Sequence, residues 1–191
     1  AYAEPSRLAN TSLARFVVDF AWLAAIVAVG RRRDTLGALM LAVPAALGTG
    51  TQLVDLGAGD GAKAMALLPA LKPVRYLAVD IAGAQMVRTL AAMAAAHPQL
   101  PLQGVVTDFA RGVQLHDDLE AGPVTFFYPG SSIGNFTPAE ARVFLRTIHE
   151  HCVGRPHSGL LIGVDTRKSK ARLEAAYDDA TGVTAAFNRN V

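Results

Sequence analysis

The chain has 191 residues, of which 51% are apolar and 18% are charged, and its formal net charge is +2. This length is sufficient to bury the core of one compact domain. The balanced charge, with no basic run longer than Arg31-Arg32-Arg33, argues against nucleic-acid and membrane partners. The single cysteine, Cys152, excludes an internal disulfide and suits a reducing compartment, so we expect a cytoplasmic protein. The sequence leaves the oligomeric state open, and we favour a monomer.

The first 50 residues are rich in alanine and other apolar residues. Residues 16–30 form the most apolar run, but they are fewer than the roughly 18 needed to span a bilayer, and they contain Asp19. We predict two packing helices, near residues 13–30 and 33–47. We therefore divide the chain into an N-terminal helical region, residues 1–50, and a ligand-binding domain, residues 51–191.

From residue 52 the pattern changes to short apolar runs that alternate with helical stretches, which is typical of β/α units around a parallel sheet. The sequence therefore predicts a Rossmann-like α/β fold, a mostly parallel sheet flanked by helices. Such a sheet usually has one or two more strands, so we expect its last strands to be lacking here. The expected strands are 52–57, 75–81, 103–107, 123–128 and 158–165, and the expected helices are 62–71, 83–96, 137–152 and 168–180.

Polar residues follow the first three of these strands, where ligands bind in open α/β sheets. The glycine-rich turn at residues 57–61 lets the backbone approach a ligand closely. Asp80 ends the second strand, where a carboxylate can accept both hydroxyls of a ribose. Asp108 and Phe109 end the third, and suit the amine and the flat face of a base. A glycine turn alone could be a simple strand-to-helix link, but the three features together predict a nucleoside site.

Two cofactors compete for that site. The spacing Gly57-x-Gly59-x-x-Ala62 fits a loose dinucleotide fingerprint, so a nicotinamide oxidoreductase is one alternative. Asp55 and Asp60 instead place negative charge where a ligand's ammonium and sulfonium would be attracted and a pyrophosphate repelled. This favours S-adenosylmethionine, although Asp55 could also serve only to brace amides of the turn.

The fourth and fifth units supply two candidate substrate residues. Asn135 lies in FYPGSSIGNF, after the fourth strand, and its amide can bind both the ammonium and the carboxylate of an amino acid. Its alternative role is to satisfy backbone groups of the loop. Tyr177 lies four residues after Leu173 on one face of the last predicted helix, so a core tyrosine is its alternative.

We predict no metal site and no activated nucleophile. His149 and His151 are two residues apart on a predicted helix and therefore lie on different faces. Methyl transfer needs neither group, because the protein mainly aligns an uncharged amine with a sulfonium that is already a good leaving group.

The segments LVDLGAGDGAKA, YLAVDI, TDFA, FYPGSSIGNFTPAEA, LLIGVDTRK and AYDDATGVTAAFN together resemble the histidine-specific methyltransferase family. Bacterial members of that family make the betaine precursor of ergothioneine from L-histidine. The resemblance spans about residues 51–190 and implies three methylations of an α-amino group, with S-adenosylmethionine as cofactor. The residues it implies are Gly57, Gly59 and Lys63 for the methionine end, Asp80 for the ribose, Asp108 and Phe109 for the adenine, and Asn135 and Tyr177 for the amino acid.

The chain departs from the family in two regions. Residues 14–37 stand where the family has a tyrosine-bearing segment, and the family's later region, which supplies an acid and a hydroxyl for the imidazole, is not in this chain. Some relatives act on a prenylated tryptophan, so another amine is an alternative substrate. A catalytically silent nucleoside-binding or scaffold protein of the same fold is the alternative from another functional class.

Overall fold

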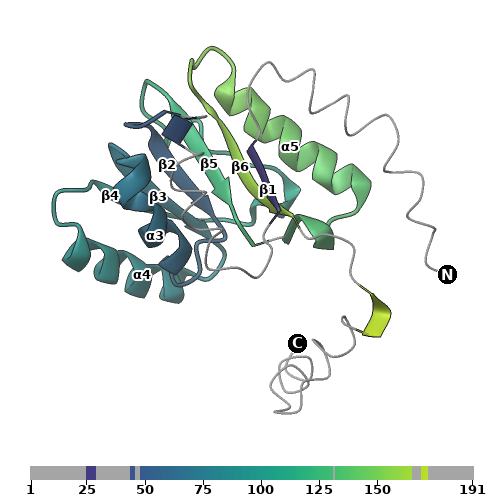
Figure 1. The fold of residues 1–191 in the computed structure, drawn as a ribbon, viewed down its shortest axis with the longest axis horizontal. Helices are drawn as coiled ribbons and strands as arrows, with labels where there is room; N and C mark the ends of the chain where they lie inside the picture. Colours follow the sequence, from purple (N-terminus) through teal and green to yellow (C-terminus); the bar gives the residue numbers. More distant parts are fainter. Residues whose placement is uncertain (1–24, 29–43, 46–47, 131, 165–168, 172–191) are drawn as a thin grey trace.

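The structure is a computed structural model and describes residues 25–28, 44–45, 48–130, 132–164 and 169–171. Its centre is a six-stranded sheet of order β1-β6-β5-β2-β3-β4, in which every neighbouring pair is parallel (Figure 1). The strands are β1 Ala25–Ala28, β2 Gln52–Leu56, β3 Arg75–Asp80, β4 Leu102–Val106, β5 Val124–Tyr128 and β6 Gly159–Val164. The helices are α3 Ala62–Leu71, α4 Gly83–Ala96 and α5 Pro138–Cys152, with short 3₁₀ helices η2 Phe109–Arg111 and η3 Ser132–Asn135.

The predicted Rossmann-like α/β architecture is confirmed from β2 to β6, with element ends within one or two residues of those expected. The helix predicted over residues 13–30 is wrong for Ala25–Ala28, which form strand β1. This strand pairs with β6, with Ala25 beside Leu161. A short apolar run such as AIVA fits a buried strand as well as a helix, so periodicity could not separate them. Most of the predicted helices 33–47 and 168–180 lies outside the described residues, and the division at residue 50 stays a prediction.

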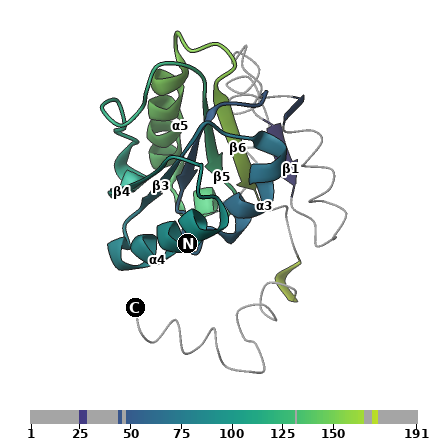
Figure 2. The same cartoon turned by 90° about the vertical axis from the view of Figure 1, so that its left-hand side faces the viewer.

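Helices cover both faces of the sheet: α3 and α4 pack on one face and α5 on the other (Figures 1 and 2). Side chains alternate between the two cores along β2, β3, β5 and β6. In β2, Leu53 faces α3 and α4 while Val54 faces α5, and both are 0% exposed. Each such side chain contributes about 2 kcal/mol through burial. Burial on both sides explains why Leu53, Val54 and Leu56 of β2 are apolar, so that only Gln52 and Asp55 in this strand are polar.

Helix α5 begins at a capping box. The Glu140 amide donates to the Thr137 hydroxyl at 3.3 Å, and the Thr137 amide donates to the Glu140 carboxylate at 2.7 Å. The Thr137 hydroxyl also donates to this carboxylate at 2.7 Å, and this bond, followed by the one from the Thr137 amide, lowers the pKa of the Glu140 carboxyl below its ordinary value. The Thr-Pro-x-Glu pattern predicts this start, which is confirmed. The cap fixes where the loop after β5 ends.

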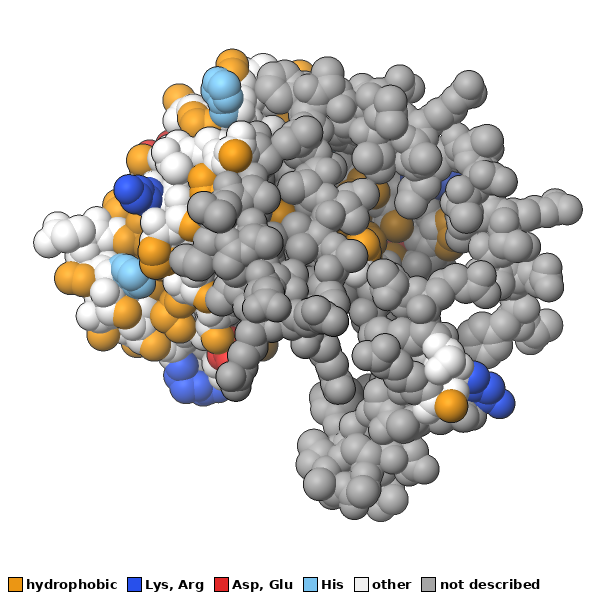
Figure 3. Space-filling view, in the orientation of Figure 1, with side chains coloured by type: hydrophobic (Ala, Val, Ile, Leu, Met, Phe, Trp, Pro, Cys, Tyr) orange, Lys and Arg blue, Asp and Glu red, His pale blue; other side chains and the backbone are white. Residues whose placement is uncertain are grey.

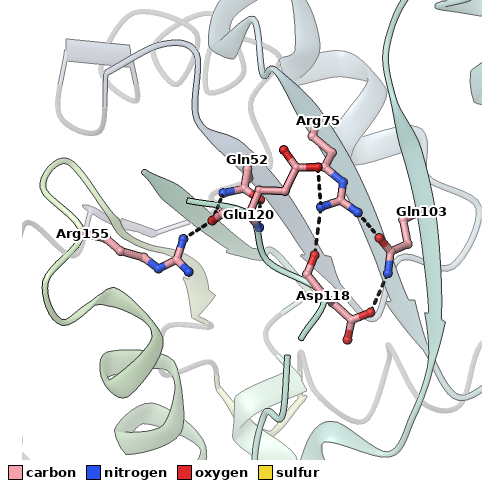
Figure 4. Close-up of polar contacts among 6 residues, drawn as sticks. All are labelled: Gln52, Arg75, Gln103, Asp118, Glu120 and Arg155. Atoms are coloured by element: carbon pink, nitrogen blue, oxygen red, sulfur yellow. Dashed lines mark hydrogen bonds and ion pairs between the residues drawn. The ribbon is translucent and has the colours of Figure 1, made fainter. Parts of the chain in front are cut away.

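A polar network lies at the amino ends of the central strands (Figure 4). Arg75, the first residue of β3, contacts the Gln103 side chain, donates to the Asp118 carbonyl at 2.9 Å and pairs with the Glu120 carboxylate at 3.3 Å. Gln52, the first residue of β2, exchanges two 2.9 Å hydrogen bonds with the Glu120 backbone. The network therefore ties the segment before β5 to the strand starts.

Among the residues that the structure describes, the Lys and Arg side chains visible on the face drawn in Figure 3 lie apart from one another. Among the helices that the structure describes, none is both long and apolar enough to cross a membrane.

Candidate functional site

The strand order reverses between β2 and β5. Strands β3 and β4 lie on one side of β2, whereas β5 and β6 lie on its other side. In open α/β sheets, ligands bind at this point, beyond the carboxyl ends of the strands. A cavity of about 340 Å³ lies there, which we call the turn cavity. A second cavity of about 190 Å³, the strand-end cavity, adjoins it and shares Gly57, Phe109 and Tyr128. Even without the strand-end cavity, the turn cavity is large enough for a small molecule, since such sites measure about 300–1,000 Å³.

A larger groove of about 830 Å³ lies elsewhere, at the carboxyl ends of α3 and α4. Its walls are mostly proline, leucine and alanine, with Lys72 and His97 as its ionisable side chains. It lacks the convergence of carboxylates, aromatic rings and glycine backbone that the two strand-end cavities have. The cavities after β2, β3 and β5 are therefore the candidate site.

The glycine turn after β2 has a backbone that requires glycine. Gly57, Gly59 and Gly61 have φ values of 71°, 54° and 69°, in the left-handed region. Their amides are bonded within the protein: that of Gly57 donates to the Val79 carbonyl at 2.8 Å, and that of Gly61 donates to the Ala58 carbonyl at 2.8 Å. The turn thus offers a ligand a close backbone surface, while the amides of Gly57 and Gly61 are already bonded within the protein.

Asp80 both braces this turn and faces the strand-end cavity. One carboxylate oxygen accepts the Gly59 amide at 3.0 Å, and the other accepts the Ala82 amide at 2.9 Å. The bracing role considered for Asp55 is therefore carried by Asp80. Each carboxylate oxygen has a second lone pair, so Asp80 can still accept ribose hydroxyls.

Asp108 and Phe109 lie beside Asp80 and line the strand-end cavity. The Phe109 ring meets the Tyr128 ring edge to face, with centroids 5.7 Å apart, and both residues line both cavities. These two rings therefore lie where the turn cavity and the strand-end cavity meet. Lys63, exposed in the first turn of α3, lines the turn cavity.

Asp55 contributes a buried carboxylate to the turn cavity. It is 3% exposed, and one of its oxygens accepts a hydrogen bond from the Tyr76 hydroxyl at 2.8 Å. Burial raises the pKa of the Asp55 carboxyl from 3.8 to about 6, while the Tyr76 bond and the charge of Lys63 oppose the rise. The turn cavity therefore contains a carboxyl group whose pKa is raised well above its ordinary value.

The two predicted substrate residues are not brought into these cavities by the described structure. Asn135 is exposed at the end of η3, and it lines neither cavity, although Ser132 and Phe136 on either side of it do. Tyr177 lies outside the described residues. The substrate roles of both stay proposals.

Tyr128 lines both cavities and was missed by the sequence analysis, whereas Ser132, which lines the turn cavity, lies in the segment FYPGSSIGNF that the sequence analysis singled out. Tyr128 is the last residue of β5, its hydroxyl is hydrogen-bonded to Ser132, and burial raises its pKa above the ordinary value. Ligands bind at the carboxyl ends of parallel strands, and the same argument that selected Asp80 and Phe109 applies to Tyr128 at the end of β5.

The histidines of α5 are engaged in packing. His151 is buried, its Nδ1 donates to the Thr147 carbonyl at 2.6 Å and its Nε2 accepts the Leu115 amide at 3.1 Å. Within the described part of the chain, no three His, Cys, Asp or Glu side chains lie close enough to hold a metal ion. Cys152 lies buried in the core beneath α5.

Comparison with known proteins assigns this chain to a family. The family model described as histidine-specific methyltransferase, SAM-dependent, matches residues 36–191. The chain belongs to this family. It is 38% identical over 151 residues to histidine N-alpha-methyltransferase of Mycolicibacterium smegmatis, covering 77% of this chain and 46% of that protein. It is 32% identical over 151 residues to ergothioneine biosynthesis protein 1 of Neurospora crassa, covering 74% of this chain and 17% of that protein.

The fold has a solved counterpart in a Methanococcus maripaludis protein, named as a candidate S-adenosyl-L-methionine-dependent methyltransferase. That structure superposes with a TM-score of 0.51 at 20% identity and covers 82% of this chain and 71% of that chain. This likeness confirms the predicted fold class. The chain spans less than half the length of the curated relatives that it matches, at 46% and 43%.

Proposed function

We propose that this chain binds S-adenosylmethionine and acts in methyl transfer to the α-amino group of an amino acid. The observation that carries the proposal is the pair of adjoining cavities. Their linings differ in the same way as the nucleoside and the amino-acid ends of that cofactor. The strand-end cavity offers the carboxylate of Asp80 and the ring of Phe109 to a nucleoside. The turn cavity offers side chains of opposite charge, Asp55 and Lys63, to the ammonium and carboxylate of the methionine end.

The same charges argue against a nicotinamide dinucleotide. Asp55 and Asp60 both line the turn cavity, where a pyrophosphate would have to lie. Two carboxylates beside two phosphate charges would be repelled. A zwitterionic ligand end instead meets a complementary pair.

We propose L-histidine as the acceptor and its trimethylated betaine, hercynine, as the product, on the strength of the family. S-adenosylmethionine would supply a methyl group on a sulfonium that leaves as a neutral thioether. The protein has to exclude water, hold the cofactor and align an uncharged amine with the methyl carbon. We assign the holding of the cofactor to Gly57, Gly59, Lys63, Asp80, Asp108 and Phe109, and the holding of the amino acid to Asn135 and Tyr177.

The test is mass spectrometry of the purified chain incubated with S-adenosylmethionine and a mixture of free amino acids. We expect stepwise methyl additions to histidine. Additions to another amine, such as a tryptophan derivative, would keep the reaction class and overturn the substrate. Absence of methylation with any amine would overturn the activity.

Two variants separate the cofactor role from the substrate role. Asp80→Ala should weaken S-adenosylhomocysteine binding by tenfold or more in calorimetry, because it removes the acid that braces the turn and faces the ribose. Asn135→Ala should spare that binding and weaken binding of the amino acid. Equal loss of both ligands in Asn135→Ala would remove its assignment to the substrate.

A silent nucleoside-binding protein of the same fold is the second candidate. The position of Asn135 outside both cavities favours it, because no other predicted substrate residue lies in the described part of the chain. Binding of S-adenosylhomocysteine without turnover on any amine would support this candidate.

A further inference from the structure

A buried hydrogen bond links the core of the sheet to the turn cavity. Tyr76 in β3 is 0% exposed, and its hydroxyl lies 2.8 Å from one carboxylate oxygen of Asp55 in β2. The strands pair in register with Leu53 beside Tyr76, so the tyrosine side chain reaches along the face of the sheet to Asp55. Both burial and the neighbouring Asp55 raise the pKa of Tyr76, so its hydroxyl stays protonated and acts as the donor.

The tip of Tyr76 also lies beneath the glycine turn. A Cβ placed on Gly61 would come within 3.9 Å of the Tyr76 hydroxyl oxygen and within 2.7 Å of the Thr89 side chain. Thr89, from α4, donates its hydroxyl to the Gly59 carbonyl at 2.6 Å. Thr89 and Tyr76 therefore both lie beside the turn that Asp80 also braces, and of these two Tyr76 is the one that contacts a carboxylate of the turn cavity.

The charged groups around Asp55 do not by themselves keep it ionised. Lys63 favours the charged form, whereas Asp80, Asp60 and burial oppose it. A hydrogen bond donated to a carboxylate stabilises the ionised form over the neutral one. Among the neighbouring side chains, the Tyr76 bond opposes the effect of burial most strongly.

We propose that Tyr76 is a positioning residue for the cofactor: its hydroxyl holds Asp55 in its ionised form and aimed at the turn cavity, so that Asp55 attracts the cationic end of the ligand. This deepens the proposed function and rests on it. Under this proposal, the preference of the site for a cationic ligand end depends on Tyr76, which lines neither cavity.

The experiment measures binding of two probes to the whole chain by calorimetry between pH 5.5 and 8.5. S-adenosylhomocysteine carries the ammonium, and 5′-methylthioadenosine has the same nucleoside without the amino-acid end. For the unmodified chain we expect S-adenosylhomocysteine affinity to fall about threefold or more as the pH is lowered through about 6. The affinity for 5′-methylthioadenosine should stay nearly constant.

Tyr76→Phe keeps the ring and removes the hydroxyl. We expect the fall in S-adenosylhomocysteine affinity to move to higher pH, giving a loss of roughly three- to tenfold at pH 7 that shrinks towards pH 8.5. Asp55→Asn should abolish the pH-dependent fall, and adding Tyr76→Phe to it should cause little further loss. In each variant 5′-methylthioadenosine should bind as it does to the unmodified chain.

The outcomes separate the two proposals. If the unmodified chain binds neither probe, the proposed function fails. If it binds both but Tyr76→Phe leaves the pH profile of S-adenosylhomocysteine in place, the role of Tyr76 is overturned. A loss that is equal for both probes and independent of pH would assign Tyr76 to packing alone and would also overturn it.

Discussion

Gly163 in β6 lies against the backbone of Pro129, the residue that follows β5, so closely that a Cβ on Gly163 would overlap the Pro129 carbonyl oxygen. The two strands pair in parallel, and Pro129 begins the loop that leads to Ser132 and the turn cavity. The absence of a side chain at residue 163 therefore sets how close that loop can lie to the sheet.

Gly163→Ala should lower the free energy of unfolding by about 1–3 kcal/mol, because backbone atoms cannot move aside as a flexible side chain can. Urea denaturation measures the effect. Gly134→Ala is the matched control, since a Cβ there meets no atom within 4 Å and its φ lies outside the left-handed region. Equal stability of the two variants would contradict the close packing.

Gly61→Ala should damage the glycine turn more than strain alone would. Gly61 has a φ of 69°, and an added Cβ would lie 2.7 Å from a methyl carbon of Thr89. We expect a loss of stability of about 2 kcal/mol or more and at least tenfold weaker S-adenosylhomocysteine binding. Gly122→Ala, with a φ of 111° and open space around its Cβ, controls for backbone strain and should spare ligand binding.

Asp55→Asn should stabilise the ligand-free protein at pH 7.5. The carboxyl has a folded pKa of about 6 against 3.8, so the folded state holds its proton more tightly and this group costs stability as the pH rises through that window. The cost above pH 6 is about 3 kcal/mol at about 1.4 kcal/mol per pKa unit. Chemical denaturation should therefore show a gain for Asp55→Asn at pH 7.5 that shrinks towards pH 4. A gain of the same size at both pH values would contradict the assignment.

His151 should make the protein less stable in mild acid. Burial chiefly lowers its pKa below the ordinary 6.5; stacked His116 and Arg155 add to this, while the Thr147 bond and Glu150 oppose it. The unfolded chain therefore takes up the proton first, and this contribution to stability is complete above about pH 6.5 and declines as the pH falls below it.

His151→Phe tests this by keeping a ring and removing the titration and both hydrogen bonds. We expect a loss of about 1–3 kcal/mol at pH 7.5, because the Leu115 amide is left without its acceptor. The difference from the unmodified chain should become smaller at pH 5.5. Parallel stability curves for the two proteins across this range would contradict a folded-state role for the neutral imidazole.

Much of the fold was predictable because its signals are local. The Thr137 cap, the glycine turn and the alternation of apolar runs each depend on residues close in sequence, and α3 and α4 have the predicted bounds. The error at β1 has the opposite cause, since its pairing with β6 joins residues far apart in the chain. The composition of a short apolar run does not show which strand it will pair with.

The candidate site was predictable where it follows strand ends, and less so where it depends on packing. Asp80, Asp108 and Phe109 line one cavity as the strand-end rule requires. The contact between Asp55 and Tyr76 could not be read from the sequence, because it depends on the register of two strands and on which face each side chain takes. The bond from the Gly57 amide to the Val79 carbonyl was hidden for the same reason.

The polar network of Gln52, Arg75 and Gln103 has a consequence for how such a protein can diversify. It anchors the strands at their amino ends, whereas the cavities open at their carboxyl ends. Inherited changes in the loops after β4 and β5 can therefore alter ligand preference while the anchors that keep the strands aligned are retained. The side chains of this network and the residues that line the two cavities therefore lie at opposite ends of the strands.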